Sequence, residues 1–272
     1  MKKLWTILLA AIACVSLTGC FGLGLNIDGA EITKEVADGI NEYQRNKADG
    51  GSGVLGVSEQ SFSTPEAAIE HFVGAVTDND LEGALEACAI YAYGTDFDFH
   101  QYSDRLSVIM PGAAPAPAEY DMFADLNQLQ QAATMGNYIR YFCYSFFIDE
   151  DLSMPIVLGE SDISIEDFMA AVDPAQLHSL EIVRMDEPMP EVLHSETNTS
   201  NFDRQAASYG ADGMTEMVVL YDLNGQLYCG GFGLLNYGGD WKICRLNSML
   251  AGQPAYGTVA PITESEYQSV IS

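Results

Sequence analysis

The stretch Met214–Asn247, MTEMVVLYDLNGQLYCGGFGLLNYGGDWKICRLN, decides the fold that we predict for this chain. Apolar and β-branched residues fill three runs, which the dipeptides Asn224-Gly225 and Gly238-Gly239 separate. Such dipeptides favour tight turns between antiparallel strands, because their residues adopt positive φ at low cost. The pattern predicts an antiparallel meander of three strands, at residues 214–222, 226–236 and 241–247.

Helical patterns precede this meander. Ser63 or Thr64 can cap a helix, Pro65 suits its first turn, and Glu66 favours the positive end of its dipole. The segment Thr77-Asp78-Asn79-Asp80 is expected to end this helix and cap a second one, whose buried face begins at Leu81. Further helices are expected at 119–148, 164–172 and 198–209, with a strand at 180–185 and a capped helix near residues 263–266.

Helices followed by a meander give an α+β order. We therefore predict an α+β fold in which N-terminal helices pack on a curved antiparallel sheet. Residues 94–175 are expected to form an enlarged helical insertion. Within it, residues 138–148 are dense in Tyr and Phe, which indicates either a deeply buried helix or the lining of a ligand cavity.

The N-terminus has the pattern of an export signal. Met1-Lys2-Lys3 precedes an apolar run from Leu4 to Val15, and Leu17-Thr18-Gly19-Cys20 follows. The run is about a dozen residues, whereas a membrane-spanning helix needs roughly 20, so we expect a signal peptide. Its end resembles the lipobox of bacterial lipoproteins. The alternative is an ordinary secretory leader with a chance cysteine.

The lipobox resemblance implies cleavage between Gly19 and Cys20 and lipidation of the Cys20 thiol. Acyl chains such as palmitate would then hold the protein at the extracytoplasmic face of the cell membrane. The expected organisation is a signal peptide at 1–19, a flexible tether at 20–60, the α+β domain at 61–250 and a C-terminal tail at 251–272. In the tether, Ile32, Val36, Ile40 and Tyr43 recur at helical spacing, which suits either a short helix or a disordered tail.

Composition limits the possible partners. Removing residues 1–19 leaves 253 residues (272 − 19), enough for one large domain or two small ones. The net charge is −28, and losing Lys2 and Lys3 brings it near −30 (−28 − 2). Such a surface repels nucleic acid, which we exclude as a partner. The remaining alternatives are a merely solvated acidic surface and a specific cationic partner.

Three short segments resemble a known superfamily. Residues 64–72, TPEAAIEHF, with 78–85, DNDLEGAL, resemble the opening helix pair of nuclear transport factor two-like (cystatin-like) domains, and 238–243, GGDWKI, resembles their closing strand. The resemblance implies a cone-shaped domain, with a long helix in the concave side of a bent sheet and a cavity at one end. Many exported lipoproteins of unknown function look similar, whereas residues 94–175 depart from the pattern.

Two acidic motifs could bind a cation. If residues 96–100 are extended, the side chains of Asp96, Asp98 and His100 lie on one face of the segment. That face could bind a cation or hold a proton relay. The alternative is a solvated polar face over two buried phenylalanines. Asp149-Glu150-Asp151 with Glu160 is similar to a calcium loop, but Met154 stands where glycine is needed. We therefore expect an acidic surface loop there, and predict no metal, cofactor or catalytic residue.

Four cysteines remain after residue 20, namely Cys88, Cys143, Cys229 and Cys244. They permit two disulfides in three connectivities, or buried thiols that pack as small apolar groups. A turn near Gly238 places Cys229 opposite Asn247, so the possible Cys229–Cys244 disulfide needs a bulge or a different register.

The sequence thus predicts a membrane-anchored extracytoplasmic lipoprotein whose domain binds a small ligand, a wall component or a protein partner without catalysis. One alternative is a cavity enzyme of isomerase or hydratase type, which requires a carboxylate of raised pKa beside a tyrosine. The other is an envelope assembly or structural factor, which requires an exposed apolar groove or sheet edge.

Overall fold

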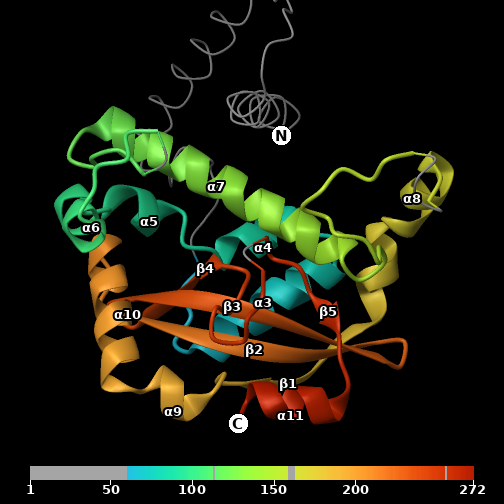
Figure 1. Ribbon diagram of the computed structural model, residues 1–272. Coiled ribbons are helices and arrows are strands. Elements are labelled where there is room, and N and C mark those ends of the chain that lie inside the picture. The colour runs from blue at the N-terminus through green and yellow to red at the C-terminus, as the bar shows by residue number, and fades with distance from the viewer. Residues whose placement is uncertain (1–59, 113, 159–162, 255) are drawn as a thin grey trace, which may run out of the picture.

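The computed structural model describes residues 60–112, 114–158, 163–254 and 256–272 (Figure 1). The expectations for the leader, for Cys20 and for residues 21–59 lie outside these ranges, as does Glu160. Within the described ranges, no helix combines the length and the apolar character that crossing a bilayer requires.

The structure confirms the predicted α+β fold, with helices packed on a curved antiparallel sheet and a helical insertion before it. The described helices are α3 (Pro65–Thr77), α4 (Leu81–Glu86), α5 (Tyr91–Thr95), α6 (Phe99–Leu106), α7 (Asp121–Tyr144), α8 (Ile165–Ala171), the 3-10 helix η1 (Pro174–Ser179), α9 (Pro190–Leu193), α10 (Glu196–Ser208) and α11 (Glu264–Val270). The strands are β1 (Leu180–Asp186), β2 (Gly213–Leu223), β3 (Gln226–Tyr237), β4 (Asp240–Arg245) and β5 (Ala260–Pro261).

The sheet is a meander in the order β1-β2-β3-β4, with every pair antiparallel, and β5 also pairs with β3. Asn224 and Gly225 have φ values of 56° and 87°, and Gly238 and Gly239 have 65° and 91°. Both central residues of each hairpin thus have the positive φ that these turns need. The turn chemistry read from the sequence therefore sets the register of both hairpins.

Aromatic rings join α3, α7 and one face of the sheet. The Phe72 ring of α3 lies 5.6 Å from that of Phe142 in α7 and 5.7 Å from that of Phe232 in β3. Tyr221 of β2 lies 5.7 Å from Phe142, and all four side chains are almost fully buried. Burying such a side chain contributes roughly 1.5–3 kcal/mol. Within residues 138–148, Phe142 of α7 and Phe146, which follows the end of α7, are both buried in the core.

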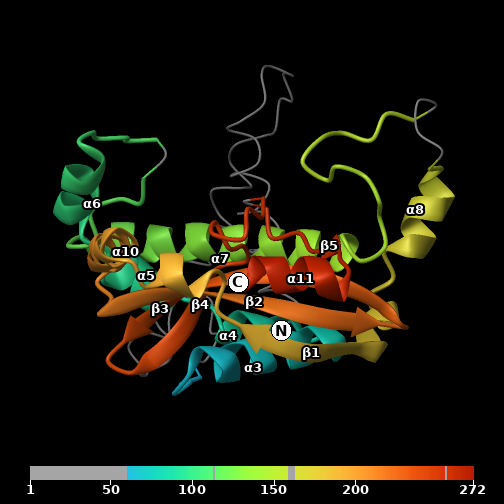
Figure 2. The same cartoon turned by 60° about the horizontal axis from the view of Figure 1, so that its bottom comes forward.

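The opposite face of the sheet is covered by the C-terminal segment that was expected to be a tail. Figure 2 shows α11 lying along β1 and β2. Tyr267 of α11 is fully buried against Val218 and Leu220 of β2. A capping box between Thr263 and Glu266 begins this helix, as the sequence indicates. Residues 251–272 therefore include part of the folded domain.

The chain enters the domain along β4. The N–H of Trp241 donates to the Phe62 carbonyl at 2.8 Å, and the N–H of Phe62 donates to Asp240 Oδ1 at 2.7 Å. The buried Lys242 ammonium donates to the Gln60 carbonyl and lies 3.3 Å from Asp240 Oδ2. It also lies 5.3 Å from the centre of the Phe62 ring. Residues 60–62 are thus fixed to the sheet by a buried, neutralised charge.

The close crossing of α5 over α7 predicts opposite effects of two glycine substitutions. A Cβ at Gly94 would lie 2.8 Å from the Gln128 backbone nitrogen and 3.1 Å from the Ala124 carbonyl oxygen. Gly94→Ala should therefore destabilise the domain by about 1–3 kcal/mol. Gly136 of α7 has nothing within 4 Å of such a Cβ, so Gly136→Ala should stabilise it by about 0.5–1 kcal/mol. Urea unfolding measures both, and stabilisation by both alanines would refute this packing.

Candidate functional site

The acidic motif at residues 96–100 does not form one extended segment, because it spans the link between α5 and the first turn of α6. Asp96 follows α5, and Asp98 caps α6 by accepting the Gln101 N–H at 2.9 Å. His100 lies inside α6, with Nδ1 3.2 Å from Asp104 Oδ2. The extended arrangement in which Asp96, Asp98 and His100 would share one face is therefore not formed. The N-cap at Asp98 outweighs the short alternation, and of the two phenylalanines Phe97 is buried whereas Phe99 is half-buried.

No metal site replaces this motif in the described part of the chain. Among those residues, no group of three or more His, Cys, Asp or Glu side chains lies close enough together to hold a metal ion.

The four described cysteines are free thiols. Cys229 lies opposite Leu220 in β2, whereas Cys244 lies at a bulge where Gly233 pairs with Arg245 and Leu234 with Ile243. The possible Cys229–Cys244 disulfide is not formed, because the two thiols belong to different parts of the sheet. Burial raises the pKa of Cys143, Cys229 and Cys244 to about 11, which keeps these thiols neutral and weakly nucleophilic.

One cluster of charged side chains surrounds the buried Glu216. Its Oε1 pairs with the Arg245 guanidinium, and its Oε2 accepts the Ser248 hydroxyl at 2.7 Å and the Leu250 N–H at 3.1 Å. Gly233 leaves room for this pair, since a Cβ there would lie 2.6 Å from Arg245 Cγ. A buried carboxylate satisfied in this way holds the segment after β4 on the sheet. Its role is therefore structural.

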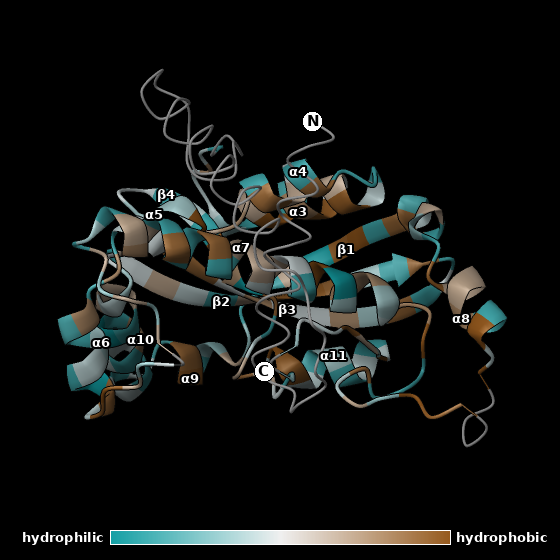
Figure 3. Ribbon diagram, turned by 90° about the horizontal axis from the view of Figure 1, so that it is seen from above, coloured by the Kyte–Doolittle hydropathy of each residue, from teal (hydrophilic) through white to brown (hydrophobic). Residues whose placement is uncertain are grey.

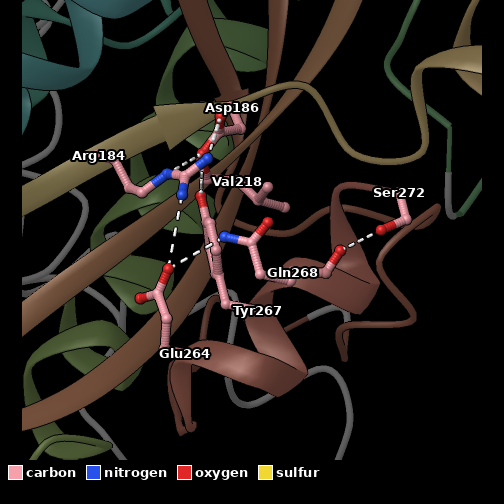
Figure 4. Close-up of polar contacts among 7 residues, drawn as sticks. All are labelled: Arg184, Asp186, Val218, Glu264, Tyr267, Gln268 and Ser272. Atoms are coloured by element: carbon pink, nitrogen blue, oxygen red, sulfur yellow. Dashed lines mark hydrogen bonds and ion pairs between the residues drawn. The ribbon is translucent and has the colours of Figure 1, made fainter.

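A second cluster joins β1 to α11 (Figure 4). Arg184 Nε donates to Asp186 Oδ2 at 2.8 Å and Nη2 donates to Oδ1 at 2.9 Å, a two-bond geometry that is strong and specific. Arg184 Nη1 lies 3.6 Å from Glu264 Oε1, and the guanidinium carbon lies 5.4 Å from the centre of the Tyr267 ring. The Tyr267 hydroxyl donates to Asp186 Oδ2 at 3.0 Å and to the Val218 carbonyl at 3.2 Å.

The electrostatics of this cluster do not suit a general acid. Hydrogen bonding from Arg184, reinforced by Tyr267, lowers the pKa of Asp186 below its ordinary value. Burial and the neighbouring Asp186 raise the pKa of Tyr267. At neutral pH, Asp186 is therefore anionic and Tyr267 is neutral. A cavity isomerase needs a carboxylate whose pKa is raised, whereas the pKa of Asp186 is lowered. Arg184, Asp186 and Tyr267 instead hold α11 on the sheet, and we call these three residues the latch.

The latch was not predicted from the sequence, although two features of the sequence favour parts of it. Arg184 is one of only eleven Lys and Arg residues in a strongly acidic chain, so a carboxylate partner is expected. The Thr263–Glu266 capping box predicts the helix that carries Tyr267. The separation of 81 positions between Tyr267 and Asp186 hid their contact from any local pattern.

Exposed apolar side chains gather away from the core, on two projecting lobes. The α6–α7 connection and the start of α7 expose Ile109, Tyr120 and Met122. The segment around α8 exposes Met154, Val157, Leu158, Ile165 and Met169. Figure 3 shows apolar colouring both along α7 and on the loop that precedes α8. Both lobes therefore offer apolar contact to another molecule, although Val183, Val192 and Met249 are also exposed elsewhere on the described surface.

No protein-family model matches the sequence, and no curated protein matches it. A crystal structure of a cystatin-like protein from Ruminococcus gnavus ATCC 29149, at 2.10 Å resolution, is similar with a TM-score of 0.46 and 18% sequence identity. The similarity covers 73% of this chain and 44% of that chain, which is less than half of the latter. The family resemblance read from residues 64–72, 78–85 and 238–243 stays a prediction.

The latch predicts a pH-dependent contribution to stability. A carboxylate of lowered pKa stabilises the fold fully above the ordinary aspartate pKa, about 3.9, and loses that effect as the pH falls through the lowered value. Asp186→Asn should therefore destabilise the domain most at neutral pH, and its effect should shrink at pH 3. Tyr267→Phe should cost about 1–3 kcal/mol, because it removes a buried donor.

Urea unfolding at pH 7 and pH 3 measures both variants. The matched control is Glu264→Gln. Glu264 is exposed and its Oε1 lies 3.6 Å from Arg184 Nη1, so this substitution should change the free energy of unfolding little. An Asp186→Asn effect of equal size at the two pH values would argue against a charged latch.

Proposed function

We propose that this chain is a bacterial lipoprotein whose α+β domain is a non-catalytic binding module held outside the cell membrane. The observation that carries the proposal is the segment Leu17-Thr18-Gly19-Cys20 after a short apolar run and two lysines. A diacylglyceryl group on Cys20 would anchor the mature chain, because two or more acyl chains give stable membrane association.

The attachment of the chain to the domain supports this arrangement. Forty positions separate Cys20 from Gln60 (60 − 20), and a flexible coil of that length reaches roughly 35 Å on average. Lys242 and Asp240 hold residues 60–62 against β4, so this edge of the sheet receives the tether. The folded domain would therefore stand clear of the head groups and remain free to turn toward a partner.

Two features favour binding over catalysis. The buried or half-buried carboxylates Glu216 and Asp186 are each paired with an arginine and serve to hold segments of the fold together. Several of the apolar side chains that could contact another molecule are exposed on the two lobes. Exposed apolar side chains on projecting segments suit a macromolecular partner better than a small solute. This is also the feature that an envelope assembly factor requires.

The anchor is tested by Cys20→Ala in the full-length chain. The variant should no longer incorporate labelled palmitate and should leave the membrane fraction, because its attachment point is gone. Far-UV circular dichroism and urea unfolding should show that the domain still folds.

Cys14→Ala is the matched control, since Cys14 lies in the expected signal peptide and outside the lipobox. It should leave labelling and membrane association unchanged. A Cys20→Ala protein that remained labelled and membrane-bound would refute the lipoprotein proposal.

A further inference from the structure

The segment around α8 projects from the end of the domain. We define the α8 lobe as residues 149–158 and 163–173, which leave the body after α7 and return to it at η1 (Figures 1 and 2). The Phe168 ring packs against Tyr144 at 5.6 Å, which ties the helix to the end of α7. No residue of α8 is fully buried. The rest of the lobe surface is therefore available to another molecule.

The lobe exposes large apolar side chains. Ile165 and Met169 are one helical turn apart and lie on the same face of α8. The relative exposures are 64% for Met154, 51% for Val157, 60% for Leu158, 54% for Ile165 and 70% for Met169. Large exposed apolar side chains mark interaction surfaces, and methionine adapts to varied partners.

The same lobe is uniformly acidic. Its residues carry six carboxylates and no Lys, Arg or His, the acids being Asp149, Glu150, Asp151, Glu166, Asp167 and Asp173. None of these carboxylates takes part in an ion pair among the described residues. Hydrogen bonds from Ser153 and Ser164 lower the pKa of Asp151 and Asp167 respectively, so both stay charged in mild acid. The lobe thus combines apolar contact area with unneutralised negative charge.

This combination selects one class of occupant. An anionic bilayer would be repelled by the carboxylates, and a neutral bilayer would gain nothing from them. An acidic or uncharged protein surface would leave the charges without partners. A helix with an apolar stripe flanked by Lys and Arg satisfies both features at once, because its stripe covers the apolar side chains while its cations reach the carboxylates.

We propose that the α8 lobe is the docking surface for a basic amphipathic helix of a protein partner. This inference rests on the proposed function and gives its binding module a partner class. The partner's apolar stripe lies on Met154, Ile165 and Met169, and its cationic side chains face Glu166 and Asp173. Charge sets the rate of encounter and the orientation, and apolar burial supplies most of the affinity.

The test is a titration of the full-length chain carrying Cys20→Ala, so that no acyl chain is added. The probe is a dye-labelled 18-residue peptide of Leu and Lys, with the leucines on one face of a helix, followed by fluorescence anisotropy. The reference probe has the same composition in an order that breaks the apolar face. The amphipathic peptide should bind at least tenfold more tightly, and added salt should weaken its binding.

Matched variants locate the surface. Ile165→Asn with Met169→Asn should weaken binding at least tenfold, and Glu166→Gln with Asp173→Asn should weaken it and reduce its salt dependence. Met122→Asn should change nothing, although Met122 on the other lobe is as exposed as Met169, at 70%. Circular dichroism should show all variants folded, because the replaced side chains are exposed.

The proposal is overturned if the Ile165 and Met169 variant binds the peptide as tightly as the parent chain, if Met122→Asn weakens binding equally, or if both peptide orders bind alike. Preferential binding of the lobe to phosphatidylcholine vesicles would overturn it in favour of a membrane contact. These readouts do not involve the lipid anchor. If the protein is anchored through Cys20 but does not bind the peptide, only the docking proposal is refuted.

Discussion

The contact of four aromatic rings between two helices and a sheet is the constraint on which the rest of this domain depends. Phe72, Phe142, Phe232 and Tyr221 join α3 and α7 to β2 and β3 in one buried cluster. Because α7 supplies Phe142, the long insertion is part of the core. The segments at the two ends of α7 then leave the core and form the α6–α7 connection and the α8 lobe. The exposed lobes are thus a consequence of the way the core is packed.

The shortage of basic residues shapes the remaining structure. Arg184, Lys242 and Arg245 each pair with a carboxylate at a point where a segment must be held to the sheet. They fix α11, the entry of the chain and the segment after β4, respectively. Because the chain has 39 acidic and only 11 basic residues, carboxylates outnumber the cations that could pair with them. Three of the six described basic side chains hold segments to the sheet, and the excess of acidic residues gives the surface a net negative charge.

The features that the sequence predicted well are those set by neighbouring residues. The two hairpins follow from Asn224-Gly225 and Gly238-Gly239, and Ser164 and Thr263 begin α8 and α11 as their capping patterns indicate. Residues 96–100 do not take the extended form in which Asp96, Asp98 and His100 would share a face, because five alternating residues cannot outweigh an N-cap at Asp98. The capping box at Thr263 predicts the helix that carries Tyr267, but its contact with Asp186 joins distant segments and leaves no local signal. The exposure of α8 likewise depends on a lack of contacts with distant segments.

We expect the α8 lobe to open independently of the aromatic core that carries it. Hydrogen–deuterium exchange of the full-length chain carrying Cys20→Ala, read by mass spectrometry, measures this. Peptides from β2, β3 and the C-terminal half of α7 should exchange only through global unfolding. Peptides from 163–173 should exchange by local opening and gain protection when the Leu/Lys helix is added. This expectation would be contradicted if residues 163–173 of the free protein exchanged as slowly as β3. It would also be contradicted if the Leu/Lys helix slowed exchange in α11 and not in residues 163–173.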